Sequence, residues 1–383
     1  MGKVGEAVNI ADLRAMARAR LPRVVFDYLD GGAEDECTLR DNVRAFRRWN
    51  FRPRHGVKLP ALDLSATVMG QTLAWPAMTA PIGYSGLMHR DGEKGAGRAA
   101  ARAGIASVLS TISGARLEDM AATGVPLFMQ IYLLGGRAAG EATIARAQGA
   151  GVKGLFLTID TPVGGLRERD VRNGLAQLLG RDLVAKARYL PDILAHPGWV
   201  ADYLLGARMS HLPNVVIPGQ GPLPLIDVAS ALQRSVVRWD DLPWIRAQWK
   251  GPIAIKGVLT GEDARRAIDG GADAVVVSNH GGRQLDGVAA GLDALPEVVA
   301  AAGGQCEVLM DGGIRRGGDI VKALALGARA VLLGRASAYG LAAGGEQGVD
   351  RALAILQADL TRTMMLLGCA SVAQLGATHL ERR

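Results

Sequence analysis

The sequence predicts an α/β fold, a (β/α)8 TIM barrel with a small N-terminal helical segment and a long insertion after the fourth strand. From residue 76 onward, short apolar runs alternate with longer Ala-rich segments of helical period, which is typical of parallel strands joined by crossover helices. The second observation is that the number of these runs is eight, as this barrel requires. The runs lie at 76–82, 106–110, 126–132, 154–160, 252–257, 273–279, 307–311 and 330–334.

The length of 383 residues suits one large domain, and 49% hydrophobic residues supply a sizeable core. We therefore expect a single domain over residues 1–383. Its expected parts are an N-terminal segment of helices followed by short strands (1–75), the barrel (76–340), the insertion (171–235) and C-terminal helices (341–383).

The segments between the runs support the barrel. GEKGAGRAAARAG before the second run, TGEDARRAIDGG before the sixth and GGDIVKALALGA before the eighth have plain helical composition. A doubly wound open sheet is the structural alternative, but APIGYSG after the first run lacks the G-x-G-x-x-G fingerprint. Residues 161–251 greatly exceed a normal connection, and they lie on the side of a barrel that carries the active site.

Composition excludes several classes of protein. Cys37, Cys306 and Cys369 are far apart, so we expect no disulfide framework and no metal site. The N-terminus has no apolar run of signal-peptide length, and no run is long enough to span a bilayer, so we expect a cytoplasmic protein. The net charge of +7 favours anionic ligands, but basic and aromatic residues do not alternate, so we expect no nucleic acid.

Polar residues gather where the predicted strands end, which is where barrel enzymes place their chemistry. They are Ser110, Thr111, Gln130, Tyr132, Thr158, Asp160, Lys256, Ser278, Asn279, His280, Asp311, Gly334 and Arg335.

The run AVVVSNHGGRQLDG (274–287) is the most informative, because His280 and Arg283 follow an apolar strand. A neutral imidazole can remove a proton near pH 7, and a guanidinium can grip a carboxylate through two hydrogen bonds. The pair therefore predicts an organic-acid substrate, in preference to a structural loop histidine beside a surface cation.

Two glycine-rich turns, MDGGIRRGGD (310–319) and LLGRASAYG (332–340), follow the last two strands and predict a phosphate site that includes Arg315 and Arg335. Lys256 ends its strand, and two roles remain open for it. It is either a Schiff-base nucleophile or a fixed charge that stabilises negative charge on a cofactor.

SNHGGRQLDG, DGGIRRGGDIVKALALGA and LLGRA, together with LPRVVFDYLDGGAEDE at 21–36, resemble the FMN-dependent α-hydroxy-acid dehydrogenases and oxidases. The resemblance covers residues 10 to 375 and is greatest to bacterial (S)-mandelate and L-lactate dehydrogenases. FDYLDGGAEDE and RERDVRNG are similar to the mandelate type, whereas HPGW and WIRAQWKGP are similar to the lactate type.

The resemblance implies a role for each matching position. His280 would be the base, Asp160 would orient it, and Arg283, Arg167, Tyr28 and Tyr132 would bind the substrate. Gly83, Leu29 and Ile112 would lie near the substrate side chain. The residues implied for FMN are Pro81, Ile82, Gly83, Ser110, Gln130, Thr158, Lys256, Ser278, Asp311, Gly313, Arg315, Gly334 and Arg335.

The implied reaction is oxidation of an (S)-2-hydroxy acid, with electrons passed to a quinone or, alternatively, to oxygen. In the insertion (171–235), leucines, Trp199 and Tyr203 lie among Arg181, Lys186, Arg188 and Arg208. This composition suits either an interfacial helix on the inner face of the cell membrane or a helical lid. Relatives suggest a homotetramer. A Schiff-base lyase using Lys256, a flavin-dependent isomerase and a non-catalytic binding barrel are the competing hypotheses.

Overall fold

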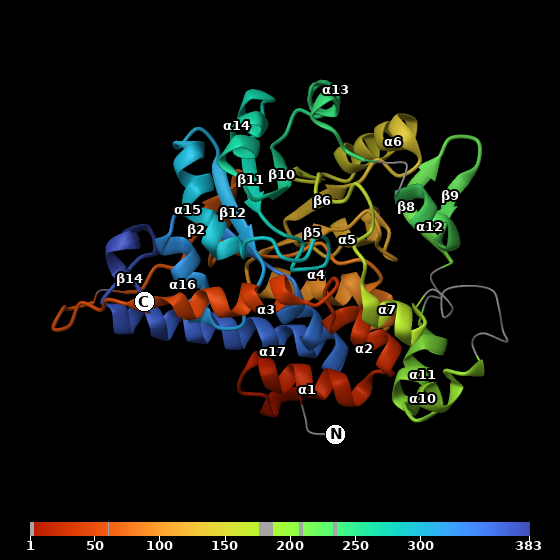
Figure 1. Cartoon of the computed structure of the whole chain (residues 1–383), viewed down its shortest axis with the longest axis horizontal. Coiled ribbons are helices and arrows are strands. Elements are labelled where there is room, and N and C mark those ends of the chain that lie inside the picture. The colour runs from red at the N-terminus through yellow and green to blue at the C-terminus, as the bar shows by residue number, and fades with distance from the viewer. Residues whose placement is uncertain (1–3, 60, 176–186, 207–209, 233–235) are drawn as a thin grey trace.

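The computed structural model describes residues 4–59, 61–175, 187–206, 210–232 and 236–383. Eight parallel strands close into a barrel, which confirms the predicted fold class (Figure 1). Each strand falls on one predicted apolar run, and only β10 ends one residue beyond its run. They are β4 (Ala77–Thr79), β5 (Ala106–Leu109), β6 (Leu127–Ile131), β7 (Leu155–Thr158), β10 (Ile253–Val258), β11 (Ala274–Val277), β12 (Glu307–Asp311) and β13 (Ala330–Leu333).

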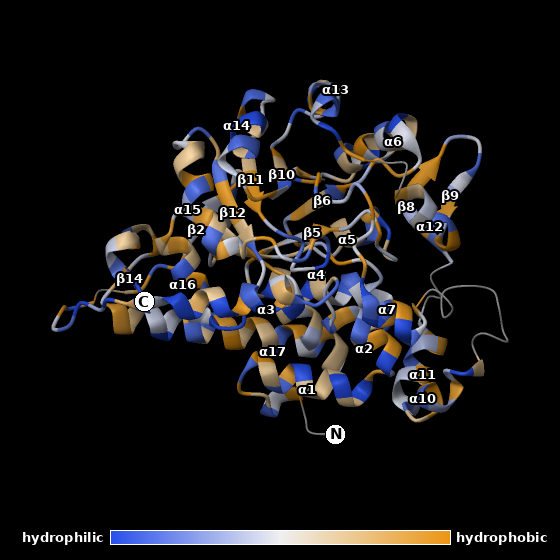
Figure 2. Ribbon diagram, in the orientation of Figure 1, coloured by the Kyte–Doolittle hydropathy of each residue, from blue (hydrophilic) through white to orange (hydrophobic). Residues whose placement is uncertain are grey.

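The barrel interior is filled by small and aliphatic side chains, with Phe128 and Phe156 in edge-to-face contact at 5.7 Å between their ring centroids. The strands are largely hydrophobic, as a fully covered parallel sheet requires (Figure 2). Val68 and Leu73 belong to the same buried cluster and come from the hairpin of β2 (Ala66–Val68) and β3 (Gln71–Leu73). Because aliphatic packing fills the interior, the room for a site is at the carboxyl end of the strands.

Helices surround the strands: α4 (Gly92–Arg102), α5 (Leu117–Ala121), α6 (Gly136–Gly149), α13 (Leu242–Gln248), α14 (Gly261–Asp269), α15 (Gly291–Ala302), α16 (Gly317–Ala325) and α17 (Arg335–Leu367). The backbone of α17 departs from helical geometry at Gly344 and Gly345. The expected division between residues 340 and 341 lies a few residues before this break, inside the first part of the helix.

The N-terminal segment begins with α1 (Ile10–Arg20), α2 (Arg23–Asp30) and α3 (Cys37–Arg44), followed by β1 (Trp49–Phe51). Helix α1 packs along α17, and β1 pairs antiparallel with β14 (Leu380–Arg382) (Figure 1). The two ends of the chain are thus joined. Short 3-10 helices complete these regions at Val4–Glu6, Ala45–Arg48, Ser85–Leu87, Val372–Gln374 and Ala377–His379.

In the structure the insertion is the whole connection between β7 and β10, so it begins before the expected residue 171. It contains α7 (Glu168–Asn173), α10 (Leu190–Leu194), α11 (Pro197–Leu205), β8 (His211–Ile217), β9 (Gly221–Pro224), η4 (Leu225–Asp227) and α12 (Val228–Leu232), with a 3-10 turn at Trp239–Asp241 before α13. The β8–β9 hairpin was not expected, because the sequence analysis considered only an interfacial helix or a helical lid for this region. It packs with α12 around Leu134, Leu212 and Val215.

Trp199, which was considered for an interfacial helix, is only 3% exposed, and its burial fits the alternative of a helix that packs on the body of the protein. Its indole Nε1 donates to the carbonyl of Leu87 at 2.7 Å, and its ring stacks on Tyr203. Asp202 on the same helix forms an ion pair with Arg20 of α1. Helix α11 therefore uses its aromatic face to dock onto the body of the protein. Arg181, Lys186 and Arg208 lie outside the described residues, and in the described part of the chain no helix is long and apolar enough to cross a membrane.

Candidate active site

A cavity of about 490 Å³ opens at the carboxyl ends of the barrel strands. Within the described residues it brings together almost all of the predicted site residues: Tyr28, Pro81, Ile82, Gly83, Ser110, Gln130, Tyr132, Thr158, Arg167, Lys256, His280, Arg283, Asp311, Gly313, Arg315, Gly334 and Arg335. Asp160 and Ser278 do not line the cavity. They lie behind it, where each contacts a side chain that does.

His280 is held by the residues around it. Its Nδ1 lies 3.0 and 3.2 Å from the two carboxylate oxygens of Asp160, and its backbone N–H donates to Ser278 Oγ at 3.0 Å. A carboxylate only accepts hydrogen bonds, so the proton of a neutral imidazole is on Nδ1 and Nε2 is the basic nitrogen. The backbone of His280 has a φ of +57°, which is unusual for a residue other than glycine. Backbone strain of this kind gathers at functional sites.

The carboxylate of Asp160 is ionised. Burial alone would raise its pKa, but His280 and Lys256 nearby, with a hydrogen bond from Thr161, outweigh that effect and lower the pKa. Gly257, with a φ of +105°, allows strand β10 to approach, because a Cβ there would lie 2.6 Å from the Cβ of Asp160. The sequence analysis did not single out Gly257, although it follows Lys256 directly.

Arg283 and Arg167 enter the same cavity from different segments. Arg283 Nη1 donates to the carbonyls of Tyr28 at 2.7 Å and Gly31 at 3.0 Å. Burial lowers the pKa of Arg283, and the charge of Arg167 lowers it further. Arg167 is anchored by Asp170 at 2.7 Å. Two guanidiniums that repel each other across a cavity favour a carboxylate between them.

Three tyrosines supply hydroxyl groups. Burial raises the pKa of Tyr28, Tyr84 and Tyr132, so each remains a hydrogen-bond donor at neutral pH. Tyr28 donates to the carbonyl of Gly83 at 3.2 Å and stacks edge-on against Tyr84. Tyr84 was missed by the sequence analysis, although it directly follows the predicted residues 81–83.

Lys256 is buried beneath the cavity, where its Nζ lies 2.9 Å from Ser278 Oγ and 3.0 Å from Asp311 Oδ2. Burial favours the neutral amine, but Asp311 and Asp160 outweigh it and raise the pKa of Lys256. The lysine is therefore a fixed positive charge. A Schiff-base nucleophile needs the neutral amine, so this environment disfavours the lyase hypothesis.

Amide and hydroxyl groups form the opposite wall. Gln130 Nε2 donates to Thr158 Oγ1 at 3.0 Å, and its Oε1 accepts from Ser110 Oγ and from the backbone of Thr111, both at 3.2 Å. These bonds fix the orientation of the Gln130 amide. The polar wall can thus contact a heterocyclic ring from the side.

At the far end the chain turns at Gly312 and Gly313, where a Cβ on Gly313 would lie 1.9 Å from the carbonyl oxygen of Asn42. Gly334 has almost no neighbour in the direction of a Cβ. Arg335 donates to the carbonyls of Leu29, Gly31 and Gly281 at 2.7 to 3.1 Å, and burial lowers its pKa to about 10. Its charge is retained at neutral pH, because backbone carbonyls bind a guanidinium without neutralising it.

The cavity fits a flavin mononucleotide. The Oδ1 of Asp311 is the one buried side-chain polar atom among the described residues without a hydrogen-bond partner, and it requires a donor such as a ribityl hydroxyl. Lysine and amide groups lie at one end of the cavity, and glycine turns with Arg315 and Arg335 lie at the other. The volume is also in the range of cofactor sites.

Leu29 and Ile112, expected near the substrate side chain, also line the cavity. Other residues complete the cavity wall, and the sequence analysis did not assign them to the site. They are Ala80, Tyr84, Met88, Thr161, Gly164, Asp170, Val171, Leu175, Leu225, Ile226, Val228, Leu232, Gly281, Gln284, Gly312, Ile314, Leu332 and Ala338. Gln284 donates to the carbonyls of Asp160 and Val163. It therefore ties the strand-end histidine loop to the start of the insertion.

These features define a barrel enzyme that binds a flavin beside a histidine held by a carboxylate. Residues 17–382 match the family model described as FMN-dependent dehydrogenase. The chain belongs to this family, so it is an oxidoreductase and its cofactor is FMN.

Known relatives support the same assignment along the whole chain. An L-lactate oxidase from Nostoc sp. is 40% identical over 387 residues, which cover 100% of both chains. An L-lactate dehydrogenase from Xanthomonas campestris pv. campestris is 43% identical over 376 residues, covering 97% of this chain and 96% of the relative. The crystal structure of the monotopic membrane protein (S)-mandelate dehydrogenase superposes with a TM-score of 0.91 at 38% identity, covering 99% of this chain and 100% of that one. Mandelate oxidase superposes with a TM-score of 0.82 at 37% identity over 98% of each chain.

Proposed function

We propose that this chain, as one domain over residues 1–383, oxidises an (S)-2-hydroxy acid of the L-lactate or (S)-mandelate type to the 2-oxo acid. The proposal rests on one observation: His280, which is held by Asp160, lines the same cavity as Arg167 and Arg283. Relatives named for lactate and structures named for mandelate support this class of substrate.

In this proposal the substrate carboxylate binds between the guanidinium of Arg283, which backbone carbonyls hold, and that of Arg167, which is paired with Asp170. The hydroxyl group of Tyr132 donates a hydrogen bond to a substrate oxygen, and that of Tyr28 does so by exchanging its bond to the carbonyl of Gly83. The Nε2 of His280 takes a proton from the substrate, and the carboxylate of Asp160 stabilises the resulting imidazolium. The proton removed is that on the α-carbon or that on the hydroxyl group, and both are compatible with this arrangement.

FMN would supply the two-electron acceptor of this reaction. Lys256, fixed by Ser278 and Asp311, would stabilise negative charge at the ring end of the site. The backbone of Pro81, Ile82 and Gly83 and the side chains of Ser110, Gln130 and Thr158 would hold the ring. Gly313, Arg315, Gly334 and Arg335 would hold the phosphate, and Asp311 would accept from a ribityl hydroxyl.

The proposed electron acceptor is a quinone, reached from a peripheral position on the inner face of the cell membrane. Leu190, Leu194, Leu204 and Leu205 in α10 and α11 are 47 to 72% exposed and offer an apolar contact surface. A structural neighbour is described as a monotopic membrane protein. Oxygen is the second candidate acceptor, because a relative at 40% identity is named an oxidase. The proposed assembly is a homotetramer.

An anaerobic visible spectrum of the purified protein tests the proposal. L-Lactate and then (S)-mandelate are added, and air is admitted last. Bleaching of the flavin bands by one of these acids supports the proposed reaction, and slow return of the colour in air supports a quinone acceptor over oxygen. A flavin that neither acid reduces would contradict the proposal.

A further inference from the structure

The last turn of α2 and the loop that leads to α3, residues 27–36 and here called the α2–α3 segment, hold two arginines of the site through their backbone. The carbonyl of Gly31 accepts from Arg283 at 3.0 Å and from Arg335 at 2.7 Å. The carbonyl of Tyr28 accepts a second bond from Arg283 at 2.7 Å. The position of this segment therefore sets the position of the Arg283 guanidinium.

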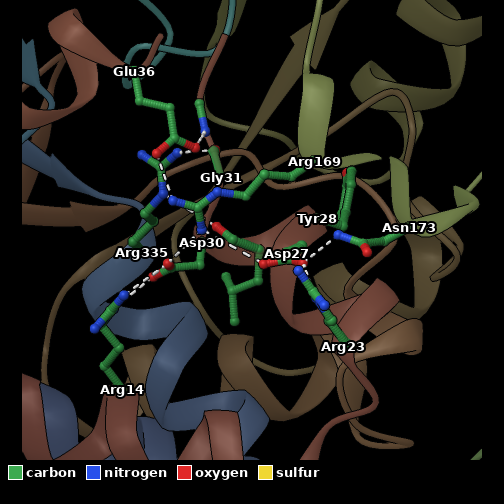
Figure 3. A network of polar contacts seen from close by, with 12 residues as sticks. Arg14, Arg23, Asp27, Tyr28, Asp30, Gly31, Glu36, Arg169, Asn173 and Arg335 are labelled. Atoms are coloured by element: carbon green, nitrogen blue, oxygen red, sulfur yellow. Dashed lines mark hydrogen bonds and ion pairs between the residues drawn. The ribbon is translucent and has the colours of Figure 1, made fainter. Parts of the chain in front are cut away.

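The carboxylates of the same segment meet one cation of the insertion (Figure 3). Arg169 Nη1 lies 3.2 Å from Asp30 Oδ2 and 3.5 Å from Asp27 Oδ1, and its Nη2 lies 2.5 Å from Glu36 Oε2. The stem of Arg169 also passes Gly31, where a Cβ would lie 3.4 Å from its Cδ. The guanidinium of Arg169 thus joins three acidic residues, two of which precede Gly31 in the sequence and one of which follows it.

Arg169 belongs to α7, the helix that begins directly after Arg167. One turn further along, Asn173 donates from Nδ2 to Asp27 Oδ2 at 2.5 Å, so Arg169 and Asn173 both bind the α2–α3 segment. The backbone N–H of Glu34 also donates to the carbonyl of Leu166 at 2.8 Å. The segment that carries Arg167 is therefore joined side by side to the segment whose carbonyls hold Arg283.

We propose that Arg169 is a positioning residue for the substrate carboxylate. By bridging Asp27, Asp30 and Glu36, it fixes the separation between Arg167 on the insertion and Arg283 on the barrel. It acts through these two arginines and does not line the cavity itself. The inference rests on the proposed function, because it assumes that a carboxylate binds between them.

The three carboxylates keep other partners when Arg169 is replaced. Asp30 retains Arg14, at 2.6 and 2.8 Å, and the hydroxyl group of Tyr339 at 2.7 Å. Asp27 retains Asn173, and Glu36 retains the backbone N–H of Gly32 at 2.9 Å. Each carboxylate therefore keeps at least one partner. The expected effect of replacing Arg169 is a change in the alignment of α7 with the α2–α3 segment.

The test compares R169Q with R169K and with the matched control R23Q. Arg23 is an exposed cation of α2 whose side chain also pairs with Asp27, at 3.4 Å, so this pair lies within one helix and does not join α2 to α7. The dissociation constant of a 2-oxo acid, pyruvate or benzoylformate, is measured on each flavin-loaded protein from the change in the flavin absorption bands. KM and kcat for the hydroxy acid are measured in parallel, with the FMN content and melting temperature as checks on folding.

In R169Q the dissociation constant and KM are expected to rise roughly tenfold, with a smaller change in kcat, because misalignment weakens the two-arginine grip. R169K, which keeps the charge but loses the planar fork, should lie between R169Q and the wild type, and R23Q should match the wild type. N173A, which breaks the second link between α7 and α2, should change both constants in the same direction and serves as the test if R169Q fails to fold.

Unchanged 2-oxo acid binding in R169Q, or an equal loss in R23Q, would overturn the inference while the proposed function stands. A wild-type flavin that no 2-hydroxy acid reduces would overturn the proposed function, and the inference with it. These outcomes are distinguishable because the first two are judged against a wild type that is reduced by substrate.

Discussion

Asp160→Asn tests the acid–base assignment most directly. The native carboxylate accepts from His280 Nδ1 at 3.0 Å and lies behind the cavity, so the substitution leaves the FMN and substrate walls intact. A hydrogen bond to a charged group contributes roughly 1.5 to 3 kcal/mol, which corresponds to a rate factor of about 10 to 150. Asparagine can also donate to Nδ1 and so place the imidazole proton on Nε2, which removes the base from the cavity. We therefore expect flavin reduction to slow by at least about tenfold.

The assay is anaerobic stopped-flow reduction of the bound flavin at saturating substrate. Asp170→Asn is the matched control, because Asp170 holds Arg167 at 2.7 Å and has no contact with His280. The control should raise KM more than it lowers the limiting rate, whereas Asp160→Asn should lower the limiting rate with the FMN content unchanged. A limiting rate within about threefold of the wild type would refute the role assigned to Asp160.

Three further predictions concern substrate size, pH and membrane contact. In Gly83→Ala the new Cβ would lie 3.2 Å from the Ile112 carbonyl oxygen and 3.3 Å from its Cγ2, so the kcat/KM ratio of (S)-mandelate to L-lactate should fall about tenfold; an unchanged ratio would show that this wall does not limit substrate size. Burial alone would raise the pKa of Asp30, but its bonds to Arg14 and Tyr339 lower it to about 2, from an ordinary value of 3.8. This depressed pKa contributes roughly 2 kcal/mol of stability, present above pH 4 and lost as the pH falls towards 2. Asp30→Asn should flatten this part of the acid unfolding curve, and a curve of unchanged slope would contradict the assignment. Leu194 and Leu205 are 68% and 72% exposed, so replacing both with Ser should abolish co-sedimentation with anionic lipid vesicles; persistent binding would exclude this surface.

The barrel was predictable from the sequence because each parallel strand is covered on both faces and forms a continuous apolar run. The strand-end residues followed from the same argument, since the carboxyl ends of all eight strands meet at one face. Asp160 and Ser278 show what this argument could not predict. Their strand-end positions were evident, but only the structure shows that they lie behind His280 and Lys256 instead of in the cavity.

The insertion was less predictable, because its elements depend on contacts with the body of the protein. Trp199 among leucines suited a membrane-facing side chain, yet its indole donates to the carbonyl of Leu87 and the side chain is buried, while Leu204 and Leu205 of the same helix are exposed. The β8–β9 hairpin is short and is stabilised by a small core with α12 and Leu134, to which residues distant in the sequence contribute. Propensity within a short segment does not reveal such partners.

The arginines around the α2–α3 segment are of two kinds: some pair with carboxylates, and others are held by backbone carbonyls. Arg14 and Arg169 are paired with carboxylates of the α2–α3 segment, whereas Arg283 and Arg335 are held by the backbone carbonyls of that same segment. Carbonyls satisfy the N–H donors of a guanidinium but leave its charge uncompensated. In the proposed function these two charges face two anions, the carboxylate of a hydroxy acid at Arg283 and the phosphate of FMN at Arg335. Because both guanidiniums bind the carbonyl of Gly31, we expect a shift of this one peptide group to move both of them.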